Sequence, residues 1–100
     1  MGMGYGLIEN LAVDESGQAL ATNLGEYKIP NIKDIPELKT TILQSDFGSG
    51  PYNSMSIGET SLIPTAAAIA NAVEDAIGVR IRSLPITAEK VLNGLKERQG

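Results

Sequence analysis

Apolar side chains recur at helical spacing through the last third of the chain. One run forms a single stripe made of Ala66, Ile69, Ala70, Val73, Ala76 and Ile77. Pro64 suits the first turn of a helix and Gly78 suits its end, so a helix is predicted between them. Because the stripe is rich in alanine, this face is flat enough for another backbone to approach closely.

Two further helices are indicated by the pattern of apolar positions. Thr87 is suited to cap a last helix, and Glu89 falls near its positively polarised end. The buried edge of that helix is formed by Val91, Leu92 and Leu95. At the start of the chain, a short helix or the end of one is indicated by apolar residues at Tyr5, Leu7, Ile8 and Leu11.

Residues 27–30 and 32–36 are predicted to be extended because of their prolines, and a hairpin and two strands are predicted elsewhere. Residues 14–17 are a turn signal between apolar segments 11–13 and 19–20, which favours a hairpin. Residues 40–43 are rich in β-branched side chains and are the best strand candidate. Residues 79–84 are predicted as a short strand with Arg80 and Arg82 on one face. The predicted fold class is α+β: one small mixed domain, residues 1–100, with a hairpin, short strands and two to three helices.

A long loop separates the strand candidate from the alanine-rich helix. It spans the fifteen residues Gln44 to Gly58 and contains four serines and three glycines. Loops of this length are uncommon inside compact domains and tend to be functional, so a site is expected here first. The glycines at positions 2, 4 and 6 do not have the G-x-G-x-x-G spacing of a dinucleotide site, and close helix packing or a tight turn explains them better.

Composition narrows the possible chemistry. The 100 residues include no Cys and no His, which excludes thiolate nucleophiles, imidazole bases and metal sites built from these side chains. The net charge is −4 and the basic residues are scattered, which argues against nucleic-acid binding. The longest uncharged stretch, 14 residues from Thr60 to Val73, is too short and too polar to span a bilayer. The lack of Cys fits the cytoplasm.

One carboxylate lies at the junction between the long loop and the alanine-rich helix. Glu59 follows Gly58 near the N-terminus of that helix, whose partial positive charge favours an ionised side chain. A general base must be deprotonated at the working pH and held on a rigid element. Acidic residues are also common in first turns for structural reasons, so the position alone leaves both roles open.

Four segments of the chain, taken together, form a specific pattern. They are residues 2–9 (GMGYGLIE), residues 23–30 ending in YKIP, residues 57–72 with IGE and LIPTAAAIANA, and residues 78–92 with GVR and LPITAEKVL. In order and spacing they resemble the C-terminal end of the large subunit of molybdenum hydroxylases, the xanthine dehydrogenase and aldehyde oxidase family. The resemblance implies that residues 1–100 are the C-terminal part of a molybdopterin-binding domain.

The resemblance also implies a reaction. Glu59 would be the general base that takes a proton from a hydroxide held by a molybdenum–pterin cofactor, so that the oxygen can attack a carbon of a purine, an aldehyde or an N-heterocycle. Ser54, Ser56 and Gly58 would contact the cofactor, although the two serines are equally compatible with an ordinary loop. The metal in this family has no protein ligand, which agrees with a chain free of Cys and His.

Further cofactors and partners follow from the same resemblance. The pterin would be in its cytosine dinucleotide form, and iron–sulfur clusters and FAD would lie on other domains or subunits. Because most of the cofactor's surroundings would lie outside these residues, the isolated chain is expected to bind no cofactor, to be inactive and to self-associate through bare apolar faces. The alternative is a non-catalytic α+β interaction or assembly module derived from the family.

Two positions depart from the family pattern. Met55 stands where the family usually has a Lys, so a cation near the base is lost. Met1 stands where the family has a glutamine that contacts the cofactor. A chain that begins in the middle of a motif is expected of a cut-out fragment or a truncated gene product.

Overall fold

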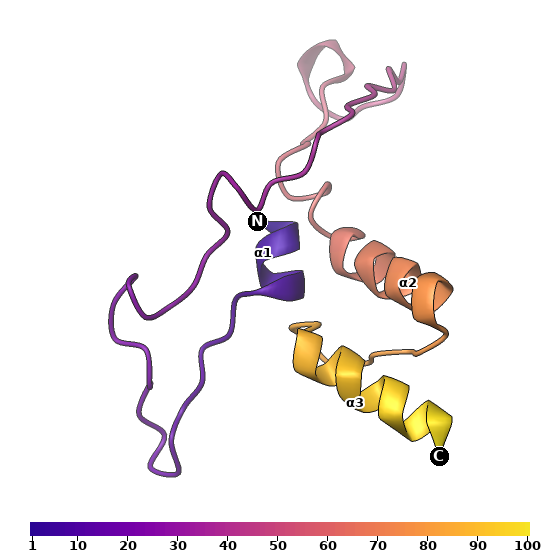
Figure 1. Cartoon of the computed structure of the whole chain (residues 1–100). Helices are drawn as coiled ribbons and strands as arrows, with labels where there is room; N and C mark the ends of the chain where they lie inside the picture. The colour runs from indigo at the N-terminus through magenta and orange to yellow at the C-terminus, as the bar shows by residue number, and fades with distance from the viewer.

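Three α-helices and one short 3-10 helix are joined by long irregular segments in the computed structural model, which describes residues 1–100 (Figure 1). The α-helices are α1 (Gly2–Leu7), α2 (Thr65–Ile77) and α3 (Ala88–Gln99), and the 3-10 helix η1 spans Pro51–Asn53. In Figure 1, α1 lies beside the start of α2, and two long segments project away from the helices at the lower left and the top. No helix is both long and apolar enough to cross a membrane.

The three helices confirm the predicted helical segments, but the predicted buried edge of the last helix is not found, because no residue of α3 is buried and Leu92 is 51% exposed. α2 begins after Pro64 and ends at Gly78, whose φ of 65° lies in the left-handed region that glycine adopts without strain. α3 begins after Thr87, whose hydroxyl oxygen accepts a hydrogen bond from the N–H of Lys90 at 3.3 Å. The short helix expected at the start of the chain is α1.

The strands of the predicted α+β fold are not confirmed. The hairpin is reduced to one antiparallel bridge between Val13 and Ala19, closed by a turn in which Asp14 Oδ1 accepts hydrogen bonds from the N–H groups of Ser16 and Gln18. The Ser16 hydroxyl also donates to Asp14 Oδ1. These hydrogen bonds lower the pKa of the Asp14 carboxyl, and the one from the Ser16 hydroxyl has the largest effect. Residues 40–43 and 79–84 form no ladder. A β-branched run becomes a strand only beside a partner edge, and none lies next to either segment.

The close approach of α1 to α2 forms the centre of the fold. A Cβ on Gly2 would lie 2.6 Å from Thr65 Oγ1, and a Cβ on Gly6 would lie 3.3 Å from Ile69 Cδ1. Ala70, on the same face of α2, is buried. The small residues of both helices therefore allow the two backbones to come together, as the flat alanine face predicts.

The segment before α3 packs against the end of α1. Pro85 and Ile86 are buried, and the Ile86 N–H donates to the Gly6 carbonyl at 2.7 Å, at the end of α1 where carbonyls lack helical partners. On α3, Lys90 Nζ donates to the carbonyls of Ser83 at 3.2 Å and Pro85 at 2.9 Å. This segment attaches α3 to α1.

Replacing Gly2 with Ala is expected to lower the thermal unfolding midpoint of the chain. The added Cβ would fall 2.6 Å from Thr65 Oγ1 and 2.7 Å from Thr65 Cβ, so α1 must move away from α2. Overpacking of this kind costs about 1–3 kcal/mol. Gly58→Ala is the matched control, because a Cβ there meets nothing within 4 Å. Melting followed by circular dichroism compares the two variants, and equal midpoints would contradict the close packing of α1 on α2.

The chain exposes far more surface than a compact domain of its size. Its radius of gyration is 17.7 Å, whereas a compact domain of this length has about 13 Å. Its accessible surface is 8420 Å², against about 5400 Å² for a compact protein of this mass. The excess of about 3000 Å² includes Ile32, Leu43 and Phe47, which are 90%, 89% and 83% exposed. Apolar exposure of this extent is typical of a surface that packs against another protein surface.

Candidate functional site

The predicted site residues lie on one continuous segment between η1 and α2. Ser54 follows η1, Ser56 and Gly58 come next, and Glu59 lies in the run of turns over residues 58–64 that leads into α2. All four residues are exposed, and none lines any of the three cavities of the structure. The structure brings them together along the chain but does not enclose them.

A tight turn sets the position of Ser54. Tyr52 and Asn53 have φ values of 55° and 59°, in the left-handed region that bulky side chains rarely adopt. The Gly50 N–H donates to the Ser54 carbonyl at 3.2 Å, and the Ser54 N–H donates to the Pro51 carbonyl at 3.1 Å. A Cβ on Gly50 would overlap Ser54 Oγ and lie 2.9 Å from the Ser54 carbonyl oxygen, so a side chain at position 50 would force this turn open.

Hydroxyl groups build the turns around Glu59. Each donates to a carbonyl three or four residues earlier: Thr60 to Ile57 at 3.2 Å, Ser61 to Gly58 at 3.3 Å and Thr65 to Ser61 at 3.1 Å. The Leu62 N–H also donates to the Glu59 carbonyl at 3.0 Å. These bonds hold the main chain of Glu59 in front of α2 while its side chain remains exposed. The sequence interpretation missed them, although Ser and Thr just before a helix are a signal for such bonds.

Hydrogen-bond donors of the same segment are free. The N–H groups from Met55 to Ser61 donate no hydrogen bond within the chain, and neither do the hydroxyls of Ser54 and Ser56. Gly58 faces open space, since no atom lies within 4 Å of the place a Cβ would take. A row of unpaired N–H and O–H groups beside a position without a side chain suits an oxygen-rich ligand.

Glu59 has no cationic partner within the chain. Met55, which stands where a Lys is expected, is 63% exposed. The only ion pair of the structure joins Arg80 to Glu74. The negative charge of Glu59 is therefore available to a ligand or to a second surface. No cluster of three or more Asp or Glu side chains could hold a metal ion.

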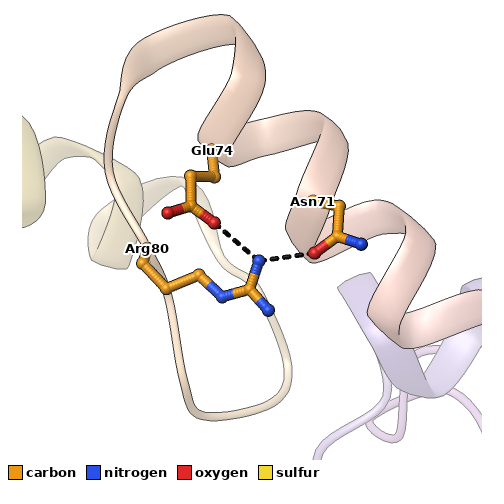
Figure 2. A network of polar contacts seen from close by, with 3 residues as sticks. All are labelled: Asn71, Glu74 and Arg80. Atoms are coloured by element: carbon orange, nitrogen blue, oxygen red, sulfur yellow. Dashed lines mark hydrogen bonds and ion pairs between the residues drawn. The ribbon is translucent and has the colours of Figure 1, made fainter.

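The Arg80 network is a further polar feature that the sequence interpretation missed. Arg80 Nη1 donates to Asn71 Oδ1 at 2.5 Å and to Glu74 Oε2 at 2.6 Å, and Figure 2 shows the guanidinium reaching both side chains from the neighbouring segment. Both acceptors lie on α2, so the network attaches residues 79–84 to this helix. The two charged side chains are 38% and 46% exposed, so the ion pair contributes at most about 1 kcal/mol. Its role is to stabilise the fold.

Another polar contact joins the end of α1 to the chain that returns beside it. The Tyr27 hydroxyl donates to Glu9 Oε2 at 3.0 Å. This hydrogen bond, together with partial desolvation and the negative charge of Glu9, raises the pKa of Tyr27. Glu9 lines a cavity of about 360 Å³ with Met3 and Ile35, on the other side of α1 from the Thr65 contact. None of the predicted site residues takes part in it.

Comparison with known proteins relates most of the chain to molybdenum-binding subunits. The pattern of the molybdopterin cofactor-binding domain family matches residues 1–36. The chain is 40% identical over 99 residues to the aldehyde oxidoreductase molybdenum-binding subunit PaoC of Escherichia coli K12, covering 97% of this chain and 14% of that protein. It is 39% identical over 92 residues to the xanthine dehydrogenase molybdenum-binding subunit of Escherichia coli O157:H7, covering 91% of this chain and 12% of that protein.

A solved structure shows the same arrangement of the chain. Quinoline 2-oxidoreductase from Pseudomonas putida 86 superposes with a TM-score of 0.80 at 28% identity. The superposition covers 96% of this chain and 13% of that chain. The chain thus spans about an eighth of the length of the proteins it matches.

Proposed function

The chain is homologous to a segment of the molybdenum-binding subunits of molybdenum hydroxylases, the xanthine dehydrogenase and aldehyde oxidoreductase family, and we propose that it supplies the catalytic general base of such an enzyme. The base is Glu59. The observation that carries the proposal is an exposed carboxylate, without a cationic partner, within a row of unpaired main-chain donors.

The molybdenum–pterin cofactor is proposed to lie along residues 54–58. The free hydroxyls of Ser54 and Ser56 and the neighbouring N–H groups can donate to its oxygen and ring atoms, and Gly58 leaves room for it. When bound, this group would supply the oxidising centre that takes up the hydrogen of the substrate C–H bond together with its two electrons. The proposal includes the cytosine dinucleotide form, with iron–sulfur clusters and FAD on other domains or subunits.

The step assigned to this chain is one proton transfer. An Oε atom of Glu59 accepts a proton from the water-derived oxygen that forms the new C–O bond to the substrate. The turns over residues 58–64 fix the main chain of Glu59 during this step. The proposed substrates are purines, aldehydes and N-heterocycles.

The rest of the site is proposed to come from other parts of the enzyme. The Glu59 segment is open, and about 3000 Å² of surface beyond that of a compact domain is available for packing. The proposed partners are the remaining domains of the large subunit and the iron–sulfur and flavin subunits, in a cytoplasmic enzyme. The same exposed surface supports the second candidate, a non-catalytic interaction or assembly module.

The isolated chain is expected to contain no molybdenum cofactor and to show no turnover. Its free donors face solvent on the open side, so a bound cofactor would make only a small part of its contacts with this chain. Elemental analysis of the purified chain and assays with a purine, an aldehyde and an N-heterocycle test this expectation. Near-stoichiometric molybdenum, or oxidation of any of these substrates, would contradict it.

The test of the base assignment is Glu59→Gln in the assembled enzyme that contains this chain. Turnover is measured per bound molybdenum. A large loss of turnover at unchanged molybdenum content would support the general base, and wild-type turnover would favour the assembly module.

A further inference from the structure

We propose that Tyr5 is a positioning residue for Glu59, because its hydroxyl fixes the turns that carry the base relative to α1. The inference rests on the proposed role of Glu59. The Tyr5 hydroxyl donates to the carbonyl of Leu62 at 2.8 Å, across 57 residues of sequence, and the contact is partly buried. Other side-chain hydrogen bonds to residues 56–64 come from within the segment or from the adjoining Thr65.

Leu62 carries the connection from Tyr5 to Glu59. The Leu62 N–H donates to the Glu59 carbonyl at 3.0 Å. The Leu62 carbonyl, besides accepting from Tyr5, accepts from the N–H of Thr65 at 3.2 Å. One residue therefore links the base, the first residue of α2 and the side chain from α1.

α1 is fixed by its packing in the fold, so it can hold the Tyr5 hydroxyl in place. The glycines on either side of Tyr5, Gly4 and Gly6, are buried, and the Gly6 carbonyl accepts a hydrogen bond from Ile86 at 2.7 Å. The segment 51–61, in contrast, is exposed throughout. The local hydroxyl bonds shape the turns, but they cannot fix the direction of the turns relative to α1. The Tyr5 hydroxyl adds a direct restraint to the one that the turns receive through the packing of Thr65 on α1, and a base displaced by about 1 Å can lose up to about 100-fold in rate.

Tyr5→Phe tests the inference, since it removes the hydroxyl and keeps the ring. Tyr27→Phe is the matched control, because the Tyr27 hydroxyl donates to Glu9 and not to the turns. In the assembled enzyme, Tyr5→Phe is expected to lower kcat per bound molybdenum by about 10-fold or more, with KM within about twofold. Tyr27→Phe is expected to match the wild type.

A second measurement requires no activity. In the isolated chain, hydrogen–deuterium exchange is expected to be about fivefold faster at the Leu62 and Thr65 amides of Tyr5→Phe, because the Leu62 carbonyl, which accepts from Thr65, loses its bond to α1 and the turn that contains both amides opens more often. The same amides are expected to exchange at the wild-type rate in Tyr27→Phe. Unchanged exchange in Tyr5→Phe would overturn the inference.

The double variant separates this inference from the proposed function. If Tyr5 acts through Glu59, Tyr5→Phe causes no further loss of kcat in a Glu59→Gln background. An undiminished further loss, or a wild-type kcat in Tyr5→Phe alone, would overturn the positioning role and leave the base assignment standing. Wild-type turnover in Glu59→Gln would overturn the base assignment and, with it, the catalytic purpose of the Tyr5 contact.

Discussion

Glu59→Gln in the assembled enzyme is expected to lower kcat by about 1000-fold at unchanged molybdenum content. The amide keeps the size of the side chain and its ability to form hydrogen bonds, but it cannot accept a proton at the working pH. Loss of a general base typically costs about 10²- to 10⁴-fold, which corresponds to about 3–5 kcal/mol of transition-state stabilisation. Since the Glu59 side chain is exposed in this chain, the substitution should leave the fold unchanged.

The matched control for this prediction is Glu37→Gln. Glu37 is also exposed and forms no ion pair, so the same chemical change is made away from the turns around Glu59. Stopped-flow turnover and molybdenum analysis of both variants decide the result. Loss of molybdenum from Glu59→Gln would indicate cofactor binding rather than proton transfer, and a kcat within twofold of the wild type would rule out the base.

The helices could be predicted because their signals are local. The alanine-rich stripe, Pro64 before it and Gly78 after it all lie within α2 or next to it. The same holds for Thr87, which caps α3 through a neighbour three residues away. Each signal acts within one or two turns, so no knowledge of the rest of the molecule is needed.

The predicted strands are not found in the structure, because a strand forms only beside a partner segment that can lie far along the chain. Residues 40–43 have a composition typical of a strand, but no edge lies beside them, and Ile42 and Leu43 are 81% and 89% exposed. Residues 79–84 are instead attached to α2 through the contacts of Arg80 with Asn71 and Glu74. Whether such a segment pairs is decided by tertiary context rather than by its own side chains.

In the candidate site, too, the local features could be predicted and the contacts between distant residues could not. The order of Ser54, Gly58 and Glu59 can be read from the sequence, and the structure places them on one exposed segment. Their roles remain predictions. The contact of Tyr5 with Leu62 could not be predicted, because it joins residues 57 positions apart and depends on how closely α1 packs on α2.

The triple variant Ile42→Ser, Leu43→Ser and Phe47→Ser is expected to have opposite effects on the isolated chain and on the assembled enzyme. The three side chains are 81%, 89% and 83% exposed. Burying one such side chain contributes about 1.5–3 kcal/mol, so three buried in an interface contribute about 4.5–9 kcal/mol. Their loss should weaken assembly by about 1000-fold or more. In the isolated chain, the same loss should reduce self-association and the binding of hydrophobic dyes.

The matched control changes polar positions of the same segment, in the triple variant Thr40→Ser, Thr41→Ser and Gln44→Ser, all of which are exposed. Sedimentation velocity and dye fluorescence of the isolated chains are compared with the yield of assembled enzyme. If the apolar segment packs on another domain, only the apolar variant improves the behaviour of the isolated chain and lowers the yield of the enzyme. A wild-type chain that is strictly monomeric and binds little dye would contradict the expected self-association. An unchanged yield of enzyme would show that these side chains remain in solvent after assembly.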